Sequence, residues 1–243
     1  MSSNAVTLVV PSRFAGPPGT ANGGWISGRL ASLGGLTGPV QVTLREPAPL
    51  EVALEVRVDG QGTASLGFGG ALIAEAAAGS LTEVVDPVDH ATAQAAMKNY
   101  AGWAGHPFPG CFVCGPDRPP PDGLGVFPGP LDGQPGTVAT TWLPDLSLAD
   151  DGAVAPHFVW AALDCTSGWS SDLAGRPKVL GRITAAVDAV PRIGEPCVVV
   201  GRHLRDDGRK TFTASTAYDS DGRVLGRAEA LWIALRTGPA KSL

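Results

Sequence analysis

Short runs of alternating apolar and polar residues, separated by turn residues, dominate the chain. In residues 52–58 the large apolar side chains occupy every second position, which is the period of a strand with one buried face. Proline and glycine punctuate the runs, so we expect short antiparallel strands joined by tight turns. The pattern predicts strands at 5–10, 40–44, 52–58, 64–68, 71–81, 138–142, 179–187, 197–204, 211–219 and 224–235.

Two segments have helical spacing instead. Residues 25–33 begin after Asn22, which can cap a helix, and end before two glycines. Residues 155–169 are apolar around most of the circumference, which predicts a helix buried on nearly all sides. Asp164 stands in the middle of this second helix. A carboxylate buried there must find donors, stay protonated or face a cleft.

The order of elements repeats along the chain. A strand, a loop, a helix and a set of strands occur in the first third, and the same order returns after residue 137. The last predicted strand of each set contains the same three residues, since Ala-Glu-Ala at 74–76 recurs at 228–230. Such internal symmetry predicts two copies of one structural unit. We expect an N-terminal unit at 1–86, a connector with a short helix at 87–110 and a C-terminal unit at 111–243.

The composition of the chain argues against several classes of partner and scaffold. The chain has 243 residues and a net charge of -5, with only 18 lysines and arginines, which argues against nucleic acid or an anionic membrane as a partner. No apolar run approaches the roughly 20 residues needed to span a bilayer, and the first residues do not resemble a signal peptide. The four cysteines are too few for a disulfide scaffold. We expect a cytoplasmic protein with reduced thiols.

Two short motifs are similar to those of a known family. Residues 111–115 read Cys-Phe-Val-Cys-Gly and are followed by Gly123-Leu124, which resembles the Cys-Phe-x-Cys-Gly…Gly-Leu opening of many bacterial hotdog acyl-CoA thioesterases. Residues 22–24 read Asn-Gly-Gly and resemble the start of the central helix in that family. The resemblance implies an α+β double hotdog, with two antiparallel sheets that each wrap a central helix and are joined into a pseudo-dimer.

The resemblance also implies a site shared by the two units. In the family the catalytic carboxylate lies about two turns into the central helix. In the second helix of this chain His157 matches Gly24, and the residue seven positions later is Asp164. The first helix has Ala31 at the corresponding position, so one complete site is expected. The amides of Gly23 and Gly24 would polarise a thioester carbonyl, and Asp164 would activate water or attack directly. His157 is the alternative general base.

Other residues complete the predicted site. We assign substrate contacts to Asn22, Trp25 and Trp160, the last of which also suits core packing. Cys111 and Cys114 have the spacing of half a zinc site with His106 just upstream, but a structural zinc needs four ligands and no second pair follows. We therefore expect no metal, and no cofactor beyond the CoA of the substrate.

Three functions remain open from the sequence. The first is hydrolysis of acyl-CoA or another acyl-thioester. The second is binding of acyl-CoA or a lipid without turnover, because Pro156-His157 replaces Gly-Gly at the start of the second helix. The third is a hotdog dehydratase or hydratase that uses His157 or His106. A homodimer of double hotdogs is also possible.

Overall fold

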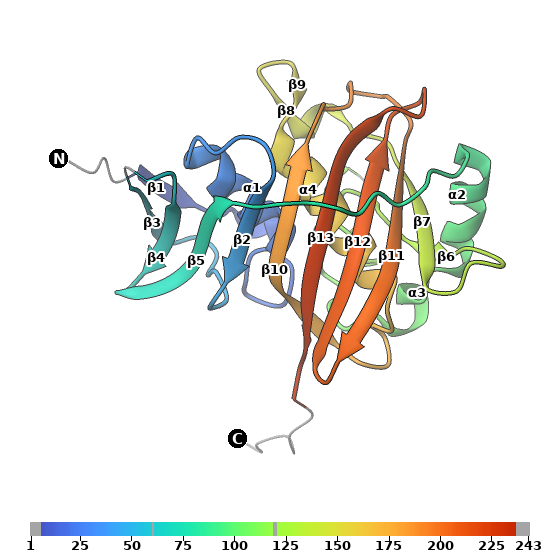
Figure 1. The fold of residues 1–243 in the computed structure, drawn as a ribbon, viewed down its shortest axis with the longest axis horizontal. Coiled ribbons are helices and arrows are strands. Elements are labelled where there is room, and N and C mark those ends of the chain that lie inside the picture. Colours follow the sequence, from blue (N-terminus) through green and yellow to red (C-terminus); the bar gives the residue numbers. More distant parts are fainter. Residues whose placement is uncertain (1–5, 60, 119–120, 237–243) are drawn as a thin grey trace.

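The computed structural model describes residues 6–59, 61–118 and 121–236. Eleven of its strands form one antiparallel sheet in the order β1-β3-β4-β5-β2-β10-β13-β12-β11-β7-β6 (Figure 1). These strands are β1 (Val6–Val9), β2 (Val40–Leu44), β3 (Ala53–Val58), β4 (Ala64–Phe68), β5 (Ala71–Ala78), β6 (Gly129–Pro130), β7 (Thr137–Trp142), β10 (Lys178–Val187), β11 (Cys197–Asp207), β12 (Lys210–Tyr218) and β13 (Val224–Ala234). A separate hairpin consists of β8 (Ala149–Asp150) and β9 (Ala153–Val154).

The strands from the two parts of the chain meet at β2 and β10. These strands pair antiparallel from Thr43 opposite Arg182 to Val40 opposite Ala185. The strands of the two parts, expected to be joined, therefore form one continuous sheet. The physical reason is that each part leaves one edge strand with unpaired backbone groups, and the two edges satisfy each other.

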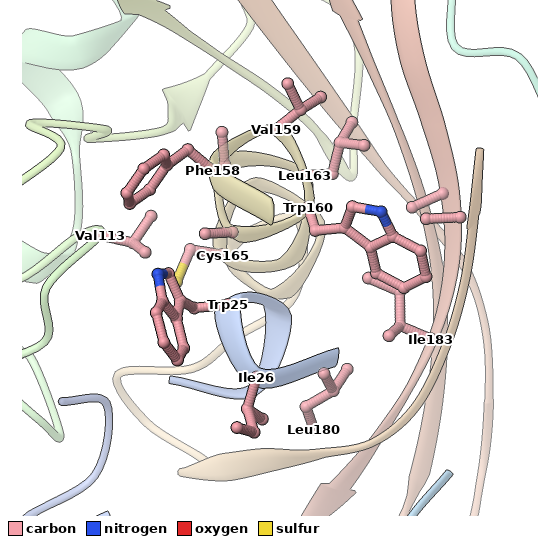
Figure 2. Close-up of a cluster of buried hydrophobic side chains, with 14 of the residues drawn as sticks. Trp25, Ile26, Val113, Phe158, Val159, Trp160, Leu163, Cys165, Leu180 and Ile183 are labelled. Carbon is pink, nitrogen blue, oxygen red and sulfur yellow. The ribbon is translucent and has the colours of Figure 1, made fainter. Parts of the chain in front are cut away.

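Two helices lie against the same face of this sheet. Helix α1 (Gly23–Leu33) packs against β2, β4, β5 and β10, and helix α4 (Pro156–Trp169) packs against β7 and β10 to β13. Helix α4 begins with proline at its first turn and is buried from His157 onward, as its apolar circumference predicts. Figure 2 shows Trp160 of α4 pointing toward the sheet beside Ile183 of β10.

Glycines let the two helices approach closely. A Cβ atom at Gly24 would lie 2.4 Å from the Asp164 Cβ and 2.6 Å from the Trp160 carbonyl oxygen. A Cβ atom at Gly28, one turn later, would lie 2.8 Å from the His157 Cα. Side chains at these positions would push the helices apart, so glycine is needed for this packing.

The segment between β5 and α2 crosses the outer face of the sheet. Residues 79–89 run over the strands of the second part toward α2 (His90–Ala96) (Figure 1). Tyr218 Oη donates to the Val85 carbonyl oxygen at 2.5 Å, and Arg202 pairs with Glu83 at 2.6 Å. This segment therefore covers part of the outer face of β11 and β12.

Several short elements complete the fold. They are α3 (Gly102–Gly105) and the single turns η1 (Ser12–Phe14), η2 (Met97–Asn99) and η3 (Leu146–Leu148). Within the described ranges, no helix combines the length and the apolar character needed to cross a membrane.

Candidate active site

A hydrogen bond joins the two central helices at the predicted site. The Gly24 amide, in the first turn of α1, donates to Asp164 Oδ2 at 2.7 Å. Amides in the first turn of a helix have no partner within the helix and carry part of its positive dipole. The structure thus brings Gly24 and Asp164 together although 140 residues separate them in the chain.

Asp164 lies in an apolar environment. Its side chain is 1% exposed, and this burial raises its pKa to about 8 despite the opposing effect of the Gly24 hydrogen bond. The second carboxylate oxygen, Oδ1, is buried and has no hydrogen-bond partner among the described residues. A buried acceptor of this kind suits a water molecule or a polar substrate group.

A cavity of about 530 Å³ lies beside the pair and is lined by both parts of the chain. Asp164 and Gly23 contribute to its wall. The Gly23 amide belongs to the same unpaired first turn and donates to none of the described residues. Most of the remaining wall is apolar, including Ile26, Leu180 and Trp232. The volume falls within the range of sites that bind small organic ligands.

Asn22 fixes the start of α1, as predicted. Its Oδ1 accepts from the Trp25 amide at 2.9 Å and so caps the helix. Its Nδ2 lies 3.6 Å from the Cys165 Sγ and 3.8 Å from the Cys111 Sγ. Asn22 also lines the cavity, so it orients both the helix and the cavity wall.

The two tryptophans assigned to substrate contacts lie elsewhere. The Trp25 ring stacks on the Phe14 ring with centroids 4.5 Å apart, and Trp160 is buried between α4 and the sheet. Neither belongs to the described cavity wall. Their observed contacts are those of core packing.

His157 is also absent from that wall. It is 7% exposed, and its ring meets the Trp25 ring edge-on at 5.4 Å. Burial, with a smaller effect from Arg29, lowers the pKa of His157 to about 3. The structure therefore does not bring His157 to the pair formed by Gly24 and Asp164. His106 does line the cavity.

One feature of the site escaped the sequence analysis. Cys165, the residue after Asp164, joins Cys111 and Cys114, and the three sulfur atoms lie within 4.8 Å of one another. All three cysteines are buried and all line the cavity. The signal in the sequence was a third cysteine on the helix that carries the acid, but its proximity to a loop more than 50 residues earlier depends on the tertiary fold.

Comparisons with family models and with curated proteins find no match for this chain. Solved structures do match it over nearly its whole length. A conserved protein of unknown function with a hot dog fold, from Alicyclobacillus acidocaldarius, has a TM-score of 0.60 at 13% identity, covering 96% of this chain and 94% of that one. The chain has a hot dog fold.

Two other solved structures also match over nearly the whole chain. The tesB protein of Mycobacterium avium subsp. paratuberculosis has a TM-score of 0.66 at 10% identity, covering 96% of this chain and 93% of that one. A protein provisionally assigned as a thioesterase, from Novosphingobium aromaticivorans, has a TM-score of 0.59 at 14% identity, with 96% of each chain covered. At these identities the likeness concerns the hot dog fold alone.

Proposed function

We propose that this hot dog protein hydrolyses an acyl-thioester, with acyl-CoA as its substrate, at Asp164, Gly23 and Gly24. The observation that carries the proposal is the 2.7 Å hydrogen bond from the Gly24 amide to Asp164, located beside a largely apolar cavity. The names of structurally similar hot dog proteins give the reaction class additional support.

In the proposed reaction the acyl chain occupies the cavity and its thioester carbonyl approaches the start of α1. The Gly23 and Gly24 amides donate to the carbonyl oxygen and stabilise the oxyanion that forms during attack. The Gly24 amide exchanges its bond with Asp164 for one with the substrate. Because both donors are backbone groups at a fixed helix terminus, they need little reorganisation as the charge develops.

Asp164 transfers a proton from the attacking water to the leaving group. The base is the ionised form of Asp164, whose share rises as the pH approaches the pKa of about 8. It holds the attacking water through Oδ1, the oxygen without a partner among the described residues, and accepts one proton as the water oxygen adds to the carbonyl carbon. The carbon–sulfur bond then breaks, and Asp164 returns the proton to the leaving thiolate. The products are a carboxylic acid and free CoA, and the carboxylate is regenerated.

The arrangement supports a double-hotdog pseudo-dimer with one site. The strand order is symmetric about the junction of β2 and β10, since β5 and β13 occupy equivalent places on its two sides, followed by β4 and β12 and by β3 and β11. We propose 1–86 and 111–243 as the two units, joined by 87–110. The mirror position of Asp164 holds Ala31, so one active site per chain follows. A homodimer of such chains and a cytoplasmic location remain predictions.

The test is a panel of acyl-CoAs of different chain lengths, with released CoA detected by a thiol-trapping reagent. Asp164→Asn should abolish release while leaving the far-UV and near-UV circular dichroism unchanged, because asparagine has nearly the same volume. Asp89→Asn is the matched control, since asparagine can replace aspartate at the N-cap of α2. Equal turnover by wild type and Asp164→Asn would contradict the proposed role of Asp164.

One observation favours a second function, which is acyl-CoA or lipid binding without turnover. The Gly24 amide already donates to Asp164, so binding of a thioester oxygen must displace an existing partner. A non-catalytic protein would bind acyl-CoA tightly and release no CoA from any member of the panel. Among the histidines considered for a dehydratase, only His106 lines the described cavity, and it lacks the Gly24 contact that supports hydrolysis.

A further inference from the structure

Three cysteine side chains meet at the cavity wall. Cys111 and Cys114 come from one loop, and Cys165 comes from α4. Figure 2 shows the Cys165 side chain leaving α4 on the side of Val113, which belongs to that loop. The Cys111 Sγ lies 3.7 Å from the Cys114 Sγ and 3.9 Å from the Cys165 Sγ. Three potential thiolate ligands therefore surround one point at the protein interior.

These separations match a metal site better than a disulfide. Sulfur atoms in a disulfide are about 2 Å apart, whereas the cysteines here are free. Ligands that bind tetrahedral zinc at about 2.3 Å lie about 3.8 Å from one another. The two sulfur separations of Cys111 lie within about 0.1 Å of that value, and the separation between Cys114 and Cys165 is within 4.8 Å.

Side-chain donors also converge on the sulfur atoms. Asn22 Nδ2 is directed at the Cys111 and Cys165 sulfurs. His106 Nε2 lies 3.3 Å from the Cys114 Sγ. Donors of this kind stabilise thiolates and orient them around a metal. Three buried thiolates would be strongly unfavourable alone, so all three cysteines can ionise together only around a cation.

The histidine acts as a donor to sulfur rather than as a ligand. The Phe108 amide donates to His106 Nδ1 at 2.8 Å, so Nδ1 carries no proton. In the neutral ring the proton is then on Nε2, which donates it to the Cys114 sulfur. This leaves three protein ligands and a fourth position on the cavity side, an arrangement found in zinc sites that bind water or substrate.

We propose that Cys111, Cys114 and Cys165 bind one Zn²⁺ ion, with the fourth ligand supplied from the cavity. Zinc fits because thiolates are among its preferred ligands and it requires no redox partner. Binding releases the thiol protons to solvent. This replaces the sequence-based expectation of no metal, which lacked the third ligand. The zinc site does not depend on thioester hydrolysis, although it adjoins Asp164.

The ion would connect the loop of Cys111 and Cys114 to α4. Gly115 ends this loop in a close turn, since a Cβ atom there would lie 2.3 Å from the Pro109 carbonyl oxygen. The same loop contacts the first part of the chain, where the Phe112 amide donates to the Ala15 carbonyl oxygen at 2.8 Å. Bound zinc would therefore hold one wall of the cavity in a fixed position.

The experiment uses the full chain, purified under reducing conditions, stripped with a chelator and then titrated with Zn²⁺ or Co²⁺. Metal analysis after desalting should give one zinc per chain. Cobalt should give thiolate charge-transfer absorption and the intense visible bands of a tetrahedral site. Cys165→Ser and Cys111→Ser should bind either metal at least tenfold more weakly. Cys197→Ser is the matched control, because Cys197 is also buried and free but outside the cluster.

Protein folding is followed separately. The chelator should lower the midpoint of thermal unfolding in wild type and Cys197→Ser, and should leave the midpoint of Cys165→Ser unchanged. Wild-type protein that retains no zinc, or Cys165→Ser that binds it with wild-type affinity, would overturn the proposal. Recovery of a disulfide between two of the three cysteines as the form present in cells would also overturn it. None of these readouts depends on CoA release, so the two proposals fail independently.

Discussion

Acid should destabilise the fold through His157. This histidine is buried beside Trp25 at the contact between α1 and α4. Burial lowers its pKa to about 3 from a usual value of 6.5. Below pH 6.5 His157 therefore binds a proton in the unfolded chain but stays neutral in the folded chain. The stability associated with neutral His157 is present above that pH and is lost as the pH falls toward 3.

The size of the effect follows from linkage between proton binding and folding. The pKa difference lowers the free energy of unfolding by about 2 kcal/mol at about pH 5, and by about 4 kcal/mol at about pH 3. Other groups titrate in the same interval. The pKa of Asp164 is raised to about 8, so protonation of Asp164 stabilises the fold as the pH falls. The total pH profile of stability therefore does not isolate His157.

A comparison with His157→Gln isolates it. Urea unfolding at about pH 7.5 and about pH 5 gives the stability of each protein at each pH. The stability difference between wild type and variant should shift by about 2 kcal/mol in favour of the variant at the lower pH. Any packing energy that the variant loses is lost at both pH values, so it cancels when the two stability differences are compared. The control is His90→Gln at the exposed start of α2. An unchanged difference would refute the reasoning.

Three further substitutions test contacts at the site and on the outer face of the sheet. Gly24→Ala should cost about 2 kcal/mol in thermal unfolding, because the added Cβ collides with α4, whereas Gly110→Ala should cost little, since nothing lies within 4 Å. Asn22→Ala should lose about 1 kcal/mol with its helix cap. Tyr218→Phe should lose a similar amount and speed hydrogen exchange near Val85, because the segment between β5 and α2 loses its bond to β12. Unaltered unfolding in any of these variants would contradict the corresponding contact.

The sequence predicted most elements because their patterns are local. The alternation in 52–58 corresponds to β3, and the spacing after Asn22 corresponds to α1 with its cap. The short helix expected in the connector is α2. The hairpin of β8 and β9 was not anticipated, because its strands have two residues each and such short strands have no detectable period.

Long-range features were harder to predict. The motif count from Gly24 identified Asp164, and the structure places the two in contact, while their catalytic role remains a proposal. The count could not show that Trp25 and Trp160 turn away from the cavity, because a buried aromatic residue has the same pattern in a core and in a pocket. The approach of Cys165 to Cys111 likewise depends on how α4 packs against a distant loop.

The pairing of β2 with β10 has a consequence for synthesis on the ribosome. Thr43 of β2 and its partner Arg182 are 139 residues apart in the chain (182 − 43). At about 5–20 residues per second, the edge of β2 would wait roughly 7–30 seconds for its partner. During that time the nascent first part has an unpaired strand edge that other chains can extend. Nascent chains that stop before β10 are therefore expected to associate with one another, so the late-made strands act as an intramolecular chaperone for the early ones.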